Sequence, residues 1–376
     1  MISVGREGSR GRAENRRPRR RAGWVLGRLG LATLGSLCVL VASLSPAGST
    51  SRPGGSREPV GSGVASWHGA SASSAALPLD DHRVSTSPTV GYVDSCVTTF
   101  AGGAGPNITG PWIDSATGTF DTLTKPHVQG NVTWKRASHS FTVSGGTRTL
   151  RTDDLPEGEP TGTFPISSTD PVYRYTRNPN SIEPQDFDWS VPADPGIARS
   201  PACAGLGPIG VAMDGVAIFD ALDATGRDAD AHEVLDACHG HPQGQGVYHY
   251  HAFTPCMTKS TTIKPGESVL VGYALDGFGI YLQRDAHDHL PTDSDLDACH
   301  GLVSTVTWNG SPTRMFHYDV TLTYPFTVGC FMGTPTRTAT GRPRTAAELQ
   351  RALTLCGDPP SKGPDDDALA LATHGP

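Results

Sequence analysis

The sequence predicts a mainly β protein: a single large β-rich domain with few short helices, stapled by disulfides and built on an internal pseudo-twofold duplication. Three observations lead to this fold class. The 376 residues include 45 Gly and 31 Pro, seven of the eight cysteines follow residue 90, and two stretches 62 residues apart repeat one set of motifs. So many turn-forming residues exclude a coiled coil or helical bundle and favour short strands joined by turns.

The net charge divides the chain into a basic head and an acidic body. Residues 1–47 hold nine Arg and two Glu, or +7, and the rest of the chain carries 21 basic and 35 acidic residues, or −14. An acidic body lacks the positive surface on which nucleic-acid binding depends. We therefore expect no nucleic-acid partner.

Both ends of the chain are predicted to lie outside the domain. In residues 1–47 an arginine-rich stretch precedes sixteen mainly apolar residues and a small-residue site, the pattern of an export signal. If it is not cleaved, this segment is a membrane anchor, and membrane contact is expected only there. Residues 48–88, rich in Ser, Gly and Ala, are predicted as a disordered linker, and residues 357–376 as a disordered acidic tail. The domain then spans residues 89–356.

Short strands are expected between the turn signals of the body. Residues of β type flank Gly145-Gly146, which predicts a hairpin formed by Ser140–Val143 and Arg148–Arg151. The alternating tyrosines of Val172–Thr176 predict another strand. A capping box that begins at Thr345 predicts one helix near the end of the domain.

The repeated motifs define two copies, about 208–256 and about 270–330. Gly210–Phe219 matches Gly272–Tyr281, and each run carries an Asp-Gly pair. We interpret these pairs as hairpin turns; the alternative is a catalytic pair of carboxylates. A Leu-Asp-Ala-Cys-His-Gly segment, an aromatic-His strand and a closing cysteine follow in both copies. We expect one copy to pack on the other in a common β core.

The first copy carries four histidines at a spacing that suits a transition metal. They form two His-x-His pairs separated by seven residues, and residues i and i+2 of a strand face the same side. If the two segments are neighbouring strands, the imidazoles converge, and imidazole nitrogens favour Zn²⁺ or Cu²⁺ over Ca²⁺ or Mg²⁺. The predicted ligands are His239, His241, His249 and His251. A structural histidine network and metal-free acid–base chemistry are the alternatives.

The second copy offers a weaker set of ligands. His300 and His317 keep their places, but Leu302 and Asp319 replace the second histidine of each His-x-His pair. The weaker set is therefore His300, His317 and Asp319. We expect one strong site, in the first copy.

Two further histidine groups are expected to face solvent. His232 with Glu233 is interpreted as a solvated surface pair rather than a ligand or base. His287 and His289 lie beside acidic residues in a predicted exposed turn.

The seven cysteines of the body predict a disulfide framework, because the chain is expected to be exported. The repeat suggests two equivalent bridges, Cys238–Cys256 and Cys299–Cys330, and bridges between the copies are the alternative. Each bridge contributes about 3 kcal/mol in the chain-entropy account. The three other cysteines leave one odd thiol; they are Cys96, Cys203 and Cys356.

These motifs resemble the YHYH domain family of bacterial exported proteins, named for the tetrapeptide that stands here at Tyr248–His251. The resemblance covers roughly residues 130–335. Its parts, in the family's order, are Thr161–Pro165, Gly210–Phe219, Cys238–His241, Tyr248–His251, Gly272–Tyr281 and Phe326–Cys330. The family usually carries a second histidine-rich set, from which Leu302 and Asp319 depart. The resemblance implies export but no particular reaction.

The sequence thus predicts an exported protein, secreted or in the cell envelope, that binds Zn²⁺ or Cu²⁺ through its histidine cluster. A metal-dependent hydrolase or oxidoreductase that uses the same cluster is one alternative. A non-catalytic envelope protein with structural histidines is another. The histidine motif contains no Glu or Ser that would act as base or nucleophile, which weighs against a hydrolase. No nucleotide or organic cofactor motif is evident.

Overall fold

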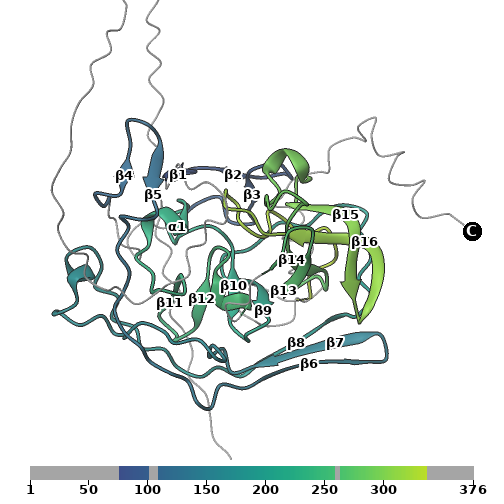
Figure 1. The fold of residues 1–376 in the computed structure, drawn as a ribbon, viewed down its shortest axis with the longest axis horizontal. Helices are drawn as coiled ribbons and strands as arrows, with labels where there is room; N and C mark the ends of the chain where they lie inside the picture. The colour runs from purple at the N-terminus through teal and green to yellow at the C-terminus, as the bar shows by residue number, and fades with distance from the viewer. Residues whose placement is uncertain (1–75, 101–108, 259–262, 337–376) are drawn as a thin grey trace, which may run out of the picture. The chain divides into compact units, whose positions relative to one another are not determined.

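The computed structural model describes residues 76–100, 109–258 and 263–336. The predicted export signal, the acidic tail, the helix expected after Thr345 and Cys356 lie outside the described residues. Within these three ranges the protein is mainly β, with four sheets (Figure 1). No helix in the described part of the chain is long and apolar enough to cross a membrane.

The largest sheet has eight strands, all from residues 208–319. In chain order they are β9 (Pro208–Ala212), β10 (Ala217–Phe219), β11 (Gly240–Pro242), β12 (Tyr248–Tyr250), β13 (Ser268–Ala274), β14 (Gly279–Gln283), β15 (Gly301–Trp308) and β16 (Ser311–Asp319). Their order across the sheet is β11-β12-β10-β9-β13-β14-β16-β15. Residues 208–256 supply one side of the sheet and residues 270–330 most of the other; we call these segments the first half and the second half.

The two halves share one order of strand pairings. In each half a hairpin, β9–β10 or β13–β14, comes first. Its second strand pairs parallel with β12 or β16, which pairs antiparallel with the edge strand β11 or β15. Where the halves meet, Val211 pairs with Tyr273, with Gly210 opposite Ala274 and Ala212 opposite Gly272. Since positions 211 and 273 are equivalent in the repeated runs, this register is symmetric about their pair.

Two glycines allow the central strands to approach each other. A Cβ atom on Gly210 would lie 2.8 Å from the carbonyl oxygen of Tyr273, and one on Gly272 would lie 2.7 Å from that of Val211. Both separations are shorter than a side chain tolerates, so these positions require glycine.

The Asp-Gly pairs form the hairpin turns of both halves. The N–H of Gly215 donates to the carbonyl of Ala212, and the N–H of Gly277 donates to that of Ala274. Both glycines have positive φ, 94° and 97°, the conformation that tight hairpin turns demand. The interpretation of these pairs as turns is confirmed.

Three smaller sheets accompany the large one. They contain β6 (His139–Ser144), β7 (Thr147–Thr152) and β8 (Phe187–Pro192); β1 (Ala76–Pro78), β5 (Thr119–Asp121) and β4 (Ile113–Asp114); and β2 (Val84–Ser85) with β3 (Val93–Asp94). The β6–β7 pair is the hairpin predicted around Gly145-Gly146. Strands β1 and β2 fall inside the segment predicted as a linker, so that prediction is wrong for residues 76–88: their composition suggests a linker, but pairing with later strands orders them.

The helices are short, as predicted. They are η1 (Pro171–Arg174), α1 (Ala229–His232), η2 (Pro255–Thr258) and η3 (Asp293–Asp295). The strand predicted at Val172–Thr176 is instead largely η1. Its side-chain cap is Asp170, which accepts from the N–H of Val172, and Pro171 occupies the first turn. A cap and a proline at this position start a helical turn, and they outweigh the alternation of the tyrosines.

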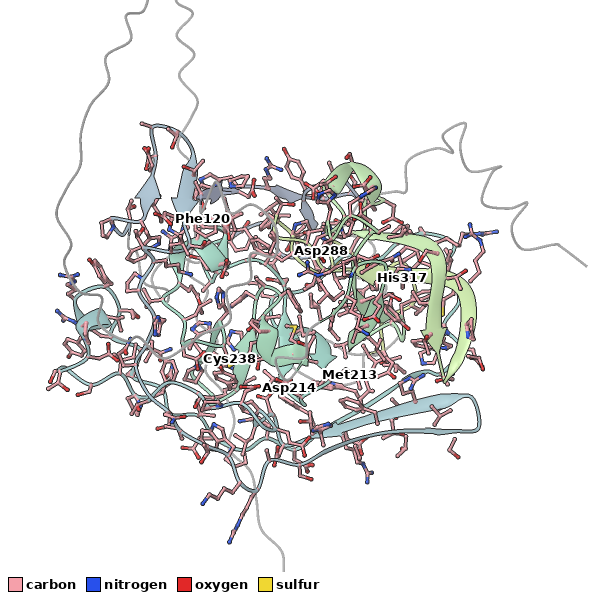
Figure 2. All side chains as sticks on the ribbon, viewed as in Figure 1. Phe120, Met213, Asp214, Cys238, Asp288 and His317 are labelled. Atoms are coloured by element: carbon pink, nitrogen blue, oxygen red, sulfur yellow. A yellow bond between two sulfur atoms is a disulfide. The ribbon has the colours of Figure 1, made fainter. Side chains whose placement is uncertain are left out.

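Three disulfides join the described cysteines. Cys238–Cys256 and Cys299–Cys330 are the predicted bridges within the halves, and Cys96–Cys203 closes a separation of 107 residues. Aromatic side chains from both halves fill the core. The largest that are fully buried include Tyr248, Tyr250, Tyr281 and Tyr318. Figure 2 shows the side chains of the described residues on the ribbon, with Cys238 and Asp214 of the first half and His317 of the second half labelled.

Candidate metal centre

Strands β11 and β12 bring three histidines of the first half together. His241 lies opposite His249 in the antiparallel pair, and His251 follows two residues later. The Nε2 atoms of His249 and His251 are 3.1 Å apart, and those of His241 and His251 are 3.4 Å apart. The ligand nitrogens of all three lie within 4.8 Å of one another, so they could hold a metal ion.

Backbone carbonyls orient two of the three imidazoles. Nδ1 of His249 lies 3.1 Å from the carbonyl oxygen of Val247, and Nδ1 of His251 lies 2.6 Å from that of Asp220. A carbonyl oxygen only accepts hydrogen bonds, so each Nδ1 carries the proton and each Nε2 presents a lone pair. Phe219 stacks on the ring of His249 at a centroid distance of 3.8 Å. Metal-ligating histidines are commonly oriented by such outer partners.

Burial favours the neutral form of His249 and His251, which metal binding requires. It lowers the pKa of His249 well below its usual value, and the charges of His241 and His251 lower it further. Burial also lowers the pKa of His251, although the nearby Glu233 opposes this shift. Two unprotonated Nε2 atoms 3.1 Å apart repel each other, and a cation between them would remove the repulsion.

Glu233 belongs to this cluster, which corrects the prediction of a solvated pair with His232. Its Oε2 lies 2.6 Å from Nε2 of His241 and 3.8 Å from Nε2 of His251, and its side chain is only 7% exposed. Burial alone would raise the pKa of Glu233, but the charge and hydrogen bond of His241 bring it to about 2. His232 is buried too, with Nε2 2.9 Å from the carboxylate of Asp81. Helix α1 directs both side chains inward, and the sequence carries no spacing signal for this.

His239 does not join the other three histidines. Its φ is 57°, so it sits in a turn before β11, and the rule that residues i and i+2 share a face does not apply to it. Its side chain is 42% exposed, with Nδ1 3.2 Å from Oδ1 of Asp230.

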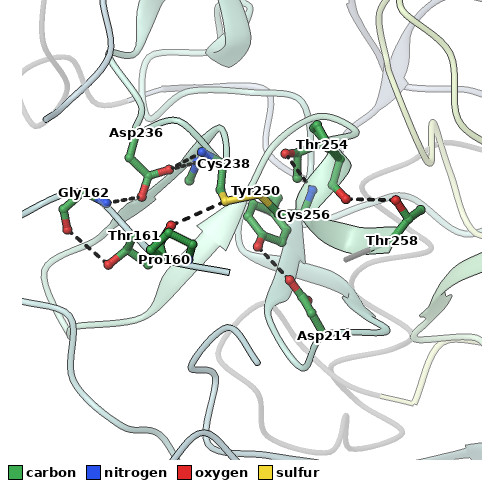
Figure 3. The surroundings of a disulfide bond; sticks show 12 residues. Pro160, Thr161, Gly162, Asp214, Asp236, Cys238, Tyr250, Thr254, Cys256 and Thr258 are labelled. Atoms are coloured by element: carbon green, nitrogen blue, oxygen red, sulfur yellow. Dashed lines mark hydrogen bonds between the residues drawn. A yellow bond between two sulfur atoms is a disulfide. The ribbon is translucent and has the colours of Figure 1, made fainter. Parts of the chain in front are cut away.

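The loop that carries His239 is held at both ends. Oδ1 of Asp236 accepts hydrogen bonds from the N–H groups of Cys238 and Gly240, and Tyr248 donates its O–H to the same carboxylate. The Cys238–Cys256 disulfide then ties the loop to the segment after β12 (Figure 3). These contacts place β11 against β12 and so align His241 with His249.

A cleft of about 500 Å³ opens beside the three imidazoles. Glu233 and the ring of Phe219 line it together with His241, His249 and His251. Polar side chains on its other walls are Thr176, Arg177, Asn178, Asn180 and Gln243. The cluster is therefore accessible to molecules larger than water.

The second half does not gather its weaker set in the same way. Nδ1 of His317 lies 3.2 Å from Oδ2 of Asp319, and both side chains are completely buried. His300 instead contacts Oγ1 of Thr321, at 3.0 Å from its Nε2, and burial lowers its pKa to about 3. Among the described residues, the three do not form a group of converging ligand atoms. His289 is 72% exposed, as expected for its loop.

Comparison with known proteins places the histidine cluster inside a recognised family segment. No curated protein and no solved structure gives a significant match to the chain. The matched segment begins in β8, ends at the start of η3 and contains the whole first half. The model of the YHYH protein family matches residues 188–293, and the family resemblance predicted from the motifs is thereby confirmed over this segment.

Proposed function

We propose that this protein is exported and binds one transition-metal ion through Nε2 of His241, His249 and His251. The observation that carries the proposal is the spacing of the nitrogens, 3.1 and 3.4 Å for two of the pairs. Two nitrogens at ~2.0–2.1 Å from a tetrahedral metal are about 3.3 Å apart. The two separations that involve His251 fall on either side of this value, and the ligand atoms of all three lie within 4.8 Å of one another, so His241 and His249 approach a common ion by small ring rotations.

Glu233 supplies the fourth donor in this proposal. Its carboxylate is buried, carries a negative charge and lies beside two of the three imidazoles. Metal binding would displace the proton that His241 Nε2 shares with Glu233, and three neutral imidazoles with one carboxylate then leave a divalent ion with one uncompensated positive charge, which a buried site tolerates better than two. This nitrogen-rich set favours Zn²⁺ or Cu²⁺ over oxygen-seeking Ca²⁺ and Mg²⁺.

Two features support export. All six cysteines of the described ranges are paired in disulfides, which persist in oxidising compartments outside the cytosol. The basic head followed by an apolar run has the pattern of an export signal.

The proposal includes an internal duplication of the first half to give the second. The shared order of pairings and the symmetric register at Val211 and Tyr273 support it. In this account both copies began with the same scaffold, and the ligands at positions 302 and 319 differ because only one copy retains the site.

Elemental analysis of the secreted protein tests the metal proposal. The wild type should contain one Zn or Cu per chain, and the double variant His249→Ala plus His251→Ala should contain none. His239→Ala is the matched control, because this histidine lies next to the cluster in sequence but does not converge with the other three. Metal well below one equivalent in a wild type supplied with Zn²⁺ and Cu²⁺, or loss of metal from the control alone, would contradict the proposal.

A metal-dependent hydrolase or oxidoreductase is the second candidate, and the cleft of about 500 Å³ beside the imidazoles favours it. In this account Glu233 is not a ligand but a base that activates water on the metal. Glu233→Gln separates the two roles. A ligand role predicts metal affinity at least about 10-fold weaker. A base role predicts full metal content with turnover reduced by about 10²–10⁴-fold.

A further inference from the structure

A second, smaller cavity lies in the second half, beside the edge strand β15. Its volume is about 210 Å³, and its walls include Gln283, His289 and Leu302. Ser304 stands two residues after Leu302 on the same face of β15, and its Oγ lies 3.4 Å from Oε1 of Gln283. The hydroxyl of Ser304 is therefore next to a side chain that lines the cavity.

Ser304, His317 and Asp319 form a continuous chain of polar contacts. Oγ of Ser304 lies 2.8 Å from Nε2 of His317, and Nδ1 of His317 lies 3.2 Å from Oδ2 of Asp319. His317 and Asp319 are adjacent positions on one face of β16, and β15 pairs with β16 so that Ser304 lies opposite Met315 on that face. The atoms meet in the order that activates a serine nucleophile.

The partners of Nδ1 determine which way the protons point. In the described part of the chain, Nδ1 of His317 lies 3.2 Å from Oδ2 of Asp319 and 3.4 Å from the carbonyl oxygen of Tyr318. A carboxylate and a carbonyl oxygen are both acceptors, so Nδ1 holds the proton of the neutral ring. Nε2 then has a free lone pair 2.8 Å from Oγ of Ser304, whereas Oε1 of Gln283, the other acceptor of the single hydroxyl proton, lies at 3.4 Å, so the shorter contact is the one in which Ser304 donates to His317. This is the polarity in which histidine can remove the hydroxyl proton.

Asp319 has few interactions that a purely structural role would explain. Its side chain is completely buried, and in the described ranges its Oδ2 lies 3.2 Å from Nδ1 of His317 without meeting the geometry of a hydrogen bond, so this contact is mainly electrostatic. A buried carboxylate that lacks such bonds costs stability and calls for an explanation. Holding His317 in the tautomer that accepts from Ser304 is one.

We propose that the second half carries an esterase site in which Ser304 is the nucleophile, His317 the general base and Asp319 a positioning residue. The substrate is a small carboxylic ester whose acyl group fits the cavity beside Leu302. Ser304 Oγ bonds to the carbonyl carbon as its proton passes to His317 Nε2. The bond to the alcohol oxygen breaks, and the alcohol leaves with that proton.

Water completes the cycle. It gives a proton to His317 Nε2 and adds its oxygen to the acyl carbon, and the bond from this carbon to Ser304 Oγ breaks as the proton returns to the serine.

The edge position of β15 in its sheet leaves backbone N–H groups that point away from β16. Such groups are the donors that stabilise the oxyanion of acyl transfer. The site shares no residue with the proposed metal centre and does not depend on it.

Labelling with an alkyl fluorophosphonate tests the nucleophile. An activated serine oxygen bonds to phosphorus and releases fluoride, and peptide mapping locates the added mass. The full-length wild type should be labelled at Ser304, with or without a chelator. Ser304→Ala should lose the label, and His317→Gln should be labelled about 10²–10⁴-fold more slowly. Ser311→Ala, an exposed serine of the same hairpin, is the matched control and should be labelled like the wild type.

Hydrolysis of p-nitrophenyl acetate tests the positioning role. Asp319→Asn should lower kcat by at least about 10-fold and leave KM unchanged, because Asp319 acts through His317 and does not touch substrate. A wild type that takes up no label at Ser304 while folded, or equal labelling of Ser304→Ala, would overturn the proposal. If a variant fails to fold, the position of the label in the wild type still decides.

Discussion

The two halves of the large sheet differ in chemistry although their strands pair in the same order. The first half presents His241, His249 and His251 around one point, with Phe219 stacked on His249. The equivalent positions in the second half carry Leu302, His317 and Asp319, and Tyr281 meets the ring of His317 edge-on at 5.1 Å. One order of strand pairings therefore carries two different polar clusters, and the difference lies in a few side chains that share a face.

Two kinds of buried contact hold the strands in place in both halves. Tyr250 donates its O–H to Asp214, and Tyr318 donates to Asp276, so each aromatic-His strand is tied to the hairpin turn of its own half. Each Cys-His loop is closed by one disulfide. These contacts are buried and recur at equivalent positions, whereas of the three converging histidines only His249 has a histidine, His317, at the equivalent position.

The largest effect is expected when the proposed metal ligands of the first half are placed at the equivalent positions of the second half. Leu302→His with Asp319→His places imidazoles at the positions equivalent to His241 and His251. A second equivalent of Zn²⁺ should bind with a Kd of about 1 μM or tighter, or about 8 kcal/mol. Titration calorimetry measures this, with Leu302→His alone as the control. If no second equivalent binds, the two faces are less alike than their pairings indicate.

Removing each disulfide in turn tests how much the stability of each half depends on its own bridge. Cys238–Cys256 closes 18 residues and Cys299–Cys330 closes 31. Replacing both cysteines of either pair by Ala should lower the free energy of unfolding by about 3 and about 4 kcal/mol, respectively, since the unfolded chain gains more freedom from the longer loop. Urea unfolding measures both values. A negligible loss for one pair would show that its half is held by other contacts.

Lowering the pH should destabilise the folded protein through the second half, because buried His300 becomes protonated on unfolding. Its pKa falls from the usual 6.5 to about 3 on folding. A histidine with a lowered pKa in the folded state contributes its full stability above pH 6.5 and loses it as the pH falls toward 3. Between pH 8 and pH 5 the loss is about 2 kcal/mol. Between pH 8 and pH 5 the free energy of unfolding of His300→Gln should therefore fall by about 2 kcal/mol less than that of the wild type, as measured by urea unfolding. A pH dependence equal to that of the wild type would contradict the assignment.

Tyrosine-to-phenylalanine variants should show the smallest difference between the halves. Tyr250 donates to Asp214, whereas Tyr318 donates to Asp276 and also accepts from the N–H of Met332. Each variant should lose about 1–3 kcal/mol of unfolding free energy, and Tyr318→Phe about 1 kcal/mol more, because it leaves an additional buried group without a partner. Thermal unfolding of the two variants side by side checks the order. A larger loss for Tyr250→Phe would reverse it.

Local patterns predicted those parts of the fold that depend on neighbours in sequence. The glycine pair between β-type runs was sufficient for the β6–β7 hairpin, and the repeat was sufficient for two disulfides. The period of two along a strand placed His249 and His251 on one face. It failed for His239, because the strand begins one residue later than the motif suggests.

The sequence by itself determined the mainly β class, the family resemblance, the Cys238–Cys256 and Cys299–Cys330 bridges, and three of the four histidines that were expected to converge. All of these follow from composition, spacing or repetition, which act over short stretches of chain. Only the tertiary structure decided that Glu233 reaches His241 and that Ser304 reaches His317. These contacts join separate elements through the path of the chain and the register of paired strands, and neither leaves a periodic signal in the sequence.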